Sequence, residues 1–260
     1  MPERLDIKNR RAAIGCLLIH GFGGNVDEIR PLADFLTEQG YRVECPSLKG
    51  HTGKREDMKR CTYWDWIASA QEGYNKLQEK CDTLYLVGFS MGGLIAFQLV
   101  LNNRVDAVVT LNTPIYYWDL KRVIINIIED LKVRKLNNIR RYIASFRSLP
   151  FNALLNFRLL LSRTKPILEE IKCPVFTVQA LEDDTVRKSS ATYIYGHIGS
   201  QCKKLEFYEE SGHLILWSKA ADRVIEDVSD FLEQIEKGKM ESELDGECWL
   251  ISKNRYRDMK

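Results

Sequence analysis

The chain has 260 residues, with 38 Lys and Arg against 36 Asp and Glu, and its formal net charge is +2. This near-balance excludes the basic excess of a typical nucleic-acid-binding domain. A content of 45% hydrophobic and 28% charged residues excludes a disordered chain. No apolar run approaches the ~20 residues that span a bilayer.

The seven cysteines are scattered along the chain, without a C-x-x-C pair and without a histidine at metal-ligand spacing. This pattern predicts reduced thiols, a cytoplasmic protein and no bound metal or other cofactor.

Short apolar runs rich in β-branched residues predict six strands. They lie at residues 14–19, 41–45, 83–87, 107–111, 175–179 and 204–208. Several are nearly continuous in apolar residues, as parallel strands covered on both faces are. Helical patterns stand between them, at 27–38 and 63–80, and further helices begin at Ser90, near Ser189 and near Ser218. The alternation predicts an α/β fold with a mostly parallel sheet.

Residues 112–174 interrupt this alternation, because a crossover between strands needs only a dozen or so residues. Apolar residues recur through this stretch at helical spacing. We therefore expect an α/β core at 1–114 and 166–240, with a helical cap inserted at 115–165. The polar tail at 241–260 has no readable role.

A glycine-rich turn joins the run at 83–87 to the next helix. Its sequence, Gly88-Phe89-Ser90-Met91-Gly92-Gly93, is a G-x-S-x-G pattern between a strand and a helix. Small residues two positions either side of Ser90 allow a tight turn that holds the hydroxyl clear of the backbone at the positive end of a helix. A glycine-rich turn without a catalytic role is the alternative, but the position after a buried strand favours Ser90 as a nucleophile.

A serine nucleophile needs a base, and the chain offers four histidines. His213 follows the last strand, where a loop at the carboxyl edge of the sheet would carry it over the turn. His20 and His51 precede Ser90, whereas the base follows the nucleophile in chains whose serine lies on such a strand-to-helix turn. His197 is typical of a helix end or surface. We therefore predict that His213 is the base.

The third group, an acid that orients the base, is expected after the strand at 175–179. Glu182, Asp183 and Asp184 stand there in a row. A solvated acidic turn has the same sequence, and spacing does not choose among the three.

The segment His20-Gly21-Phe22-Gly23-Gly24 follows the first strand. Small residues there allow backbone amides to approach a bound carbonyl, so Phe22 and Met91 are predicted to supply the two N–H groups of an oxyanion hole. A phosphate-binding turn is the alternative, but the segment lacks the third-glycine spacing of a dinucleotide fingerprint and a P-loop lysine.

Together these motifs resemble those of the α/β-hydrolases, and most closely those of small bacterial carboxylesterases and monoacylglycerol lipases. The similarity extends over about residues 12–236 and includes the 46–51 loop, Val178-Gln179-Ala180 and Glu210-Ser211-Gly212-His213. The resemblance implies a triad of Ser90, Asp183 and His213, with Asp184 as the alternative acid. It also implies a structural role for His51, a sheet of about six or seven strands, and a cap at the insertion.

The function that the resemblance implies is hydrolysis of carboxylic esters of acyl chains through an acyl-enzyme. Acyl thioesters and lysophospholipids are alternative substrates of the same chemistry, and a non-catalytic ligand receptor is the alternative from another class. No nucleic acid is expected as a partner, and the sequence does not define the oligomeric state.

The insertion suggests something about the substrate. Its aromatic residues, Tyr116, Tyr117 and Trp118 among them, are expected to line an acyl pocket, although most apolar residues there also have to form the core of the cap. From 120 to 165 it holds eleven Lys and Arg against two acidic residues. This charge favours contact with anionic lipid, or else simply keeps the cap soluble.

Overall fold

The computed structural model describes residues 11–116 and 149–245. Most of the expected cap, with Tyr117 and Trp118, lies outside the described residues, and so does the end of the tail.

Six parallel strands form a single sheet in the order β2-β1-β3-β4-β5-β6. Their bounds are β1 Ile14–Ile19, β2 Arg42–Glu44, β3 Thr83–Phe89, β4 Ala107–Leu111, β5 Val175–Ala180 and β6 Lys203–Tyr208. All six predicted strands are present, with ends that differ by at most two residues. The central strands β3, β4 and β5 are almost wholly buried, which explains their continuous apolar runs.

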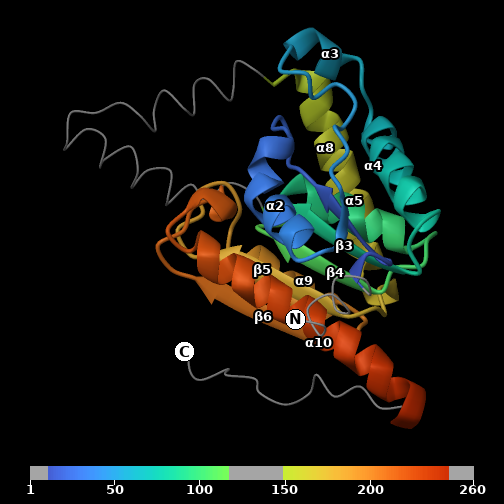
Figure 1. Ribbon diagram of the computed structural model, residues 1–260. Coiled ribbons are helices and arrows are strands. Elements are labelled where there is room, and N and C mark those ends of the chain that lie inside the picture. Colours follow the sequence, from blue (N-terminus) through green and yellow to red (C-terminus); the bar gives the residue numbers. More distant parts are fainter. Residues whose placement is uncertain (1–10, 117–148, 246–260) are drawn as a thin grey trace.

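Helices cover both faces of this sheet (Figure 1). One face packs on α2 (Arg30–Glu38) and α10 (Ala221–Asp245). The other packs on α4 (Tyr63–Gln78), α5 (Met91–Val100), α8 (Phe151–Thr164) and α9 (Ser189–His197). Alternate strand residues point to the two layers, Leu17 and Ile19 to one and Cys16 and Leu18 to the other. The fold is therefore the three-layer α/β arrangement that the sequence predicts.

The helices differ from the prediction where local chemistry interrupts periodicity. The single helix expected at 27–38 divides into a 3₁₀ turn, η1 (Val26–Ile29), and α2, because Pro31 stands in the first turn of α2. The short α3 (Arg55–Lys59) and the 3₁₀ segments η2 (Lys165–Glu170) and η3 (Ile215–Trp217) were not predicted. The helix expected near Ser218 begins as α10 three residues later.

Thr62 and Asp65 form a capping box at the start of α4, with both reciprocal hydrogen bonds present. Among the cysteines that the structure describes, pairing differs from the prediction at one position. Cys16, Cys45, Cys61, Cys81 and Cys173 are free, whereas Cys202 is disulfide-bonded. Among the described helices, none has the length and apolarity needed to cross a membrane.

Candidate active site

The candidate catalytic residues lie in loops at the carboxyl edge of the sheet. The chain runs from β1 outward to β2 and then returns to place β3 on the other side of β1. In an open parallel sheet, such a reversal opens a crevice at the carboxyl ends of the two strands. The predicted oxyanion loop follows β1 and Ser90 follows β3, so both lie at this crevice.

Ser90 occupies a strained turn between β3 and α5. Its backbone has φ +50° and ψ −119°, an uncommon conformation for a residue other than glycine. The turn is sterically closed to larger neighbours: a Cβ on Gly88 would lie 2.3 Å from the Gly93 nitrogen, and one on Gly92 2.0 Å from the Ile19 carbonyl oxygen. The G-x-S-x-G pattern therefore reflects close backbone approach on both sides of the serine.

The structure brings Asp183 and His213 together. Nδ1 of His213 lies 2.8 Å from Oδ2 of Asp183, whose side chain is 1% exposed. The other oxygen of Asp183 accepts the backbone N–H groups of Thr185 and Val186 at 2.8 and 2.9 Å. These bonds fix the orientation of the carboxylate, so that one oxygen faces the imidazole.

The neighbouring carboxylates have other partners. Glu182 accepts the backbone N–H of Ser211 at 2.9 Å, which links the acid loop to the loop that carries His213. Asp184 accepts the Thr185 hydroxyl at 3.1 Å. Of the three carboxylates in the turn, Asp183 is the one that the geometry pairs with the imidazole.

Electrostatics around His213 favour its charged form. Burial by itself lowers the pKa of the imidazole, but the charge of Asp183 and its hydrogen bond outweigh burial. Glu28 and Asp184 act in the same direction, and the pKa of His213 is raised above its usual value. His213 is therefore suited to hold a proton taken from a hydroxyl.

His213 lies beside the serine turn. Its ring packs against that of Phe89, the residue before Ser90, with centroids 5.1 Å apart. Among the hydrogen bonds of the described residues there is none between Ser90 Oγ and His213 Nε2. Such bonds are often long in unliganded enzymes and shorten when substrate binds.

Two side chains hold the loop that follows β1. Glu28 accepts the Gly21 N–H at 2.8 Å. His20, fully buried, donates from Nδ1 to its neighbour's carbonyl, that of Gly21, and accepts the Leu48 N–H at Nε2. Burial lowers the pKa of His20 to about 4, so it is neutral, with its proton on Nδ1. The sequence pattern did not single out either residue for this role.

The two predicted oxyanion donors lie after neighbouring strands, Phe22 in the loop after β1 and Met91 after β3. Met91 is the first residue of α5, where helical N–H groups have no intrahelical acceptor. Within the described part of the chain, neither the N–H of Met91 nor that of Phe22 is used in another hydrogen bond. In that part of the chain, neither N–H is therefore occupied by another acceptor, as the predicted role requires.

The remaining histidines have the structural positions expected of them. His51 is buried among the rings of His20, Phe22 and Trp66, and burial lowers its pKa. His197 is exposed at the end of α9, stacked on Tyr193 with centroids 3.7 Å apart.

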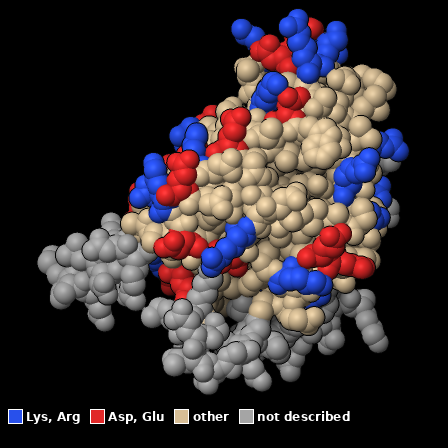
Figure 2. Space-filling view, turned by 90° about the vertical axis from the view of Figure 1, so that its right-hand side faces the viewer, with Lys and Arg blue, Asp and Glu red and all other residues tan. Residues whose placement is uncertain are grey.

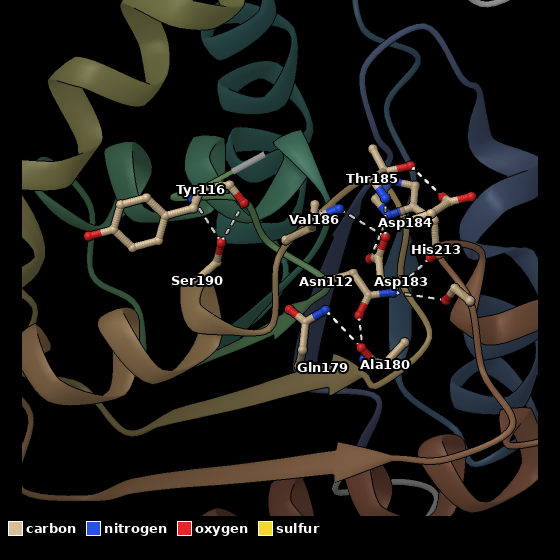
Figure 3. A network of polar contacts seen from close by, with 11 residues as sticks. Asn112, Tyr116, Gln179, Ala180, Asp183, Asp184, Thr185, Val186, Ser190 and His213 are labelled. Carbon is tan, nitrogen blue, oxygen red and sulfur yellow. Dashed lines mark hydrogen bonds and ion pairs between the residues drawn. The ribbon is translucent and has the colours of Figure 1, made fainter. Parts of the chain in front are cut away.

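Tyr116 packs against α9, away from the Asp183–His213 pair. Its N–H and carbonyl both bond to the Ser190 hydroxyl at 2.8 Å, and its ring points away from the pair (Figure 3). It lines a cavity of about 560 Å³ with Leu181, Lys188 and Tyr193, among others.

Three apolar side chains, here called the apolar wall, lie at the predicted oxyanion loop: Phe22, Phe157 and Leu149. The ring of Phe22 stacks on Phe157 of α8, with centroids 5.1 Å apart and planes at 18°. Leu149 lies against Gly23, since a Cβ built on Gly23 would be 3.0 Å from the Leu149 side chain.

Among the described residues, no group of three His, Cys, Asp or Glu side chains is placed to hold a metal ion.

Comparison with known proteins places these features in a family. Residues 17–165 match the model of the alpha/beta hydrolase fold family. A thermostable monoacylglycerol lipase from Bacillus sp. strain H-257 is 31% identical over 229 residues, which cover 84% of this chain and 90% of that protein. A carboxylesterase from Bacillus subtilis strain 168 is 28% identical over 242 residues, which cover 90% of this chain and 98% of the relative.

Solved structures show the same fold at lower identity. That of a metagenome-derived lipolytic enzyme has a TM-score of 0.71 at 24% identity, and the match covers 87% of this chain and 94% of that chain. That of a soluble variant of monoglyceride lipase from Saccharomyces cerevisiae has a TM-score of 0.68 at 17% identity, covering 86% and 87%. By its sequence match and its three-layer architecture, the chain belongs to the α/β-hydrolase family.

Proposed function

We propose that the protein is a serine hydrolase that cleaves carboxylic esters of acyl chains. The observation that carries the proposal is the 2.8 Å contact between Asp183 and His213, next to a serine held at positive φ between β3 and α5. Two curated relatives, a monoacylglycerol lipase and a carboxylesterase, support ester hydrolysis as the reaction class.

In the proposed reaction, His213 takes the proton of Ser90 as the serine oxygen attacks the ester carbonyl. The N–H groups of Phe22 and Met91 stabilise the oxyanion, and Asp183 stabilises the imidazolium. His213 then gives its proton to the departing alcohol, leaving an acyl group on Ser90. Water, deprotonated by the same imidazole, attacks this acyl-enzyme. The tetrahedral intermediate formed by this attack collapses and releases the carboxylic acid. The proton then returns from His213 to Ser90.

The acyl chain is proposed to lie along the wall formed by Phe22, Phe157 and Leu149. These side chains border the oxyanion loop and are apolar, as a site for a hydrocarbon chain has to be. Tyr116, which we expected to line an acyl pocket, packs against Tyr193 and Ser190 of α9, and Tyr117 and Trp118 lie outside the described residues. We retain residues 115–165 as a proposed cap, of which α8 packs on α4 and α5.

A series of p-nitrophenyl esters from acetate to palmitate tests the proposal. We expect turnover with an optimum at an intermediate or long chain, and complete loss in Ser90→Ala. A serine-reactive fluorophosphonate should label the wild type and not this variant. Ser162→Ala, a change of the same kind on the exposed side of α8, is the matched control and should leave activity unchanged.

Other outcomes would overturn the proposal. Labelling of Ser90→Ala at the wild-type rate would exclude Ser90 as the nucleophile. Absence of turnover at every chain length would favour a ligand receptor on the same fold. Faster turnover of acyl thioesters or lysophospholipids than of matched acyl esters would shift the substrate class while leaving the triad in place.

We also propose that the segment at 120–165 contacts anionic lipid interfaces. Besides its eleven basic residues, its described part exposes apolar side chains of α8, Phe151 by 72% and Leu159 by 49%, next to the exposed Arg158. A helix with exposed apolar and cationic residues is suited to the surface of an anionic bilayer.

A further inference from the structure

Asn112 has a positive backbone φ, which is uncommon for a residue other than glycine. It follows the last residue of β4, is fully buried, and has φ +48°. Its N–H donates to the Val178 carbonyl at 2.9 Å, while the preceding carbonyl, that of Leu111, accepts the Ser90 N–H at 2.8 Å. The end of β4 therefore contacts both the serine turn and β5.

The side chain of Asn112 bonds in two further directions. Its Oδ1 accepts the Ala180 N–H at 2.7 Å. Its Nδ2 donates to the carbonyls of His213 and Gly212 at 2.8 and 3.2 Å. Ala180 is the last residue of β5, at the start of the turn that carries Asp183, so one amide bridges the two loops that hold the acid and the base (Figure 3).

The loop that carries His213 has few other restraints close to the imidazole. On its N-terminal side Ser211 is held by Tyr208 and Glu182. Beyond it, a Cβ on Gly212 would meet no atom within 4 Å, and the His213 carbonyl accepts the Ile215 N–H at 2.9 Å within the same loop. The bonds from Asn112 to Gly212 and His213 add the restraint that ties this part of the loop to the end of β4.

We propose that Asn112 is a positioning residue that sets the distance between His213 and Asp183. This inference rests on the proposed function, in which His213 is the base. Only an amide gives both an acceptor for Ala180 and a donor for His213 in this geometry, because a carboxylate offers no hydrogen to the two carbonyls. Asn112 therefore acts on catalysis through the backbone of His213.

The variant Asn112→Asp tests this role with almost no change of shape. It keeps the acceptor for Ala180 and places an oxygen against the carbonyls of Gly212 and His213. We expect kcat for a p-nitrophenyl ester to fall on the order of 10- to 100-fold, with KM changed by less than about twofold. Because Asp183 raises the pKa of His213, a looser pair should also move the acidic limb of the kcat profile to lower pH, and this shift is read in the uncharged variant Asn112→Gly, since a new carboxylate would itself raise that pKa. Asn102→Asp, the same change at an exposed position, should behave as the wild type.

Asn112→Gly provides a second variant that favours the positive φ and removes all three side-chain hydrogen bonds. It should show the same loss of kcat. In either variant, the low-field proton signal of His213 Nδ1–H should shift or broaden relative to the wild type. Wild-type kcat and an unchanged signal in both variants would overturn the inference.

A comparison with Ser90→Ala separates this inference from the proposed function. If Ser90→Ala is inactive and the Asn112 variants equal the wild type, only the role of Asn112 is wrong. If Ser90→Ala retains turnover, the proposed function itself is wrong.

Discussion

Glu28 is a partly buried carboxylate at the candidate site that the sequence pattern does not reveal. It accepts the N–H of Gly21, in the predicted oxyanion loop, at 2.8 Å, and its charge helps to raise the pKa of His213. Burial raises the pKa of Glu28 itself, while the bond from Gly21 and the charge of His213 oppose that rise. Glu28 thus both holds the predicted oxyanion loop and favours the protonated form of His213.

The variant Glu28→Gln should move the pH dependence of activity. A base works in its neutral form, so kcat/KM rises as pH increases through the pKa of His213. Removing the negative charge of Glu28 lowers that pKa, and the acidic limb should move to lower pH by up to about one unit. Glutamine keeps an acceptor for Gly21, so the loop can stay in place.

Initial rates of ester hydrolysis between pH 5 and 9 would measure this shift. Glu38→Gln, the same change on an exposed residue at the end of α2, serves as the control and should leave the profile in place. A limb that stays at the wild-type position in Glu28→Gln, or moves to higher pH, would contradict the prediction.

At the residue scale, the sequence predicts which loops carry the site better than which atoms meet. The strand-to-helix pattern identifies Ser90, and chain order identifies His213. Residue spacing does not choose among Glu182, Asp183 and Asp184, because the choice depends on how the turn directs each carboxylate. Backbone N–H groups of Thr185 and Val186 decide it by holding Asp183 toward the imidazole.

Asn112 and Glu28 lie beyond such reasoning for a related reason. Each acts through a contact between segments far apart in the chain, and a lone Asn after a strand or a Glu in a turn has no distinctive pattern.

Among the elements, α10 is joined to the sheet edge by a cluster of charges around Arg11. The guanidinium of Arg11 contacts Glu233 at 2.6 Å and Glu236 at 3.5 Å, and lies 4.8 Å from the centroid of the Tyr41 ring. Its side chain is only 8% exposed, and the Tyr41 hydroxyl donates to Glu236 as well. Removing the cation would leave two carboxylates in a partly buried place.

Arg11→Ala should therefore lower the free energy of unfolding by roughly 2–3 kcal/mol. Urea denaturation followed by circular dichroism would measure the change. Arg30→Ala is the matched control, since Arg30 contacts Asp27 at 2.6 Å on the surface, with both side chains more than half exposed, and exposed pairs contribute little. Equal effects of the two substitutions would show that the Arg11 cluster does not fasten α10.

The elements themselves were largely predictable, and the exceptions have local causes. Nearly continuous apolar runs identify the central strands, because both faces of the sheet are covered there. The edge strands β2 and β6 are more exposed and less apolar. The helix expected at 27–38 divides at Pro31, whose missing N–H suits the start of a new helix. The short α3 has a single buried residue, Met58, so hydrophobic periodicity gives no signal there.

Over the whole molecule, the net charge of +2 conceals an uneven distribution. The face in Figure 2 carries basic and acidic side chains together, gathered over α3 at the top and along the edges of a wide uncharged area. Along the chain, by contrast, eleven of the 38 basic residues fall within 120–165, with only two acidic residues. Arg158 and Arg163 of that segment lie exposed on α8.

If this segment meets anionic lipid, binding to vesicles should depend on lipid charge and on salt. We expect the protein to sediment with vesicles that contain phosphatidylglycerol more than with pure phosphatidylcholine. The difference should shrink as ionic strength rises, because salt screens exposed charges beyond about 10 Å at 0.1 M. The double variant Arg158→Gln/Arg163→Gln should bind roughly 30-fold less, at about 1 kcal/mol per cation near the surface.

The matched control is Lys219→Gln/Arg223→Gln, which removes the same charge at exposed residues before and within α10. Since α8 and α10 cover opposite faces of the sheet, a surface localised to the insertion predicts a loss of binding in the first variant alone. Equal losses in both would mean that net charge, rather than this segment, draws the protein to lipid. Equal binding of the wild type to charged and neutral vesicles would exclude the electrostatic contact altogether.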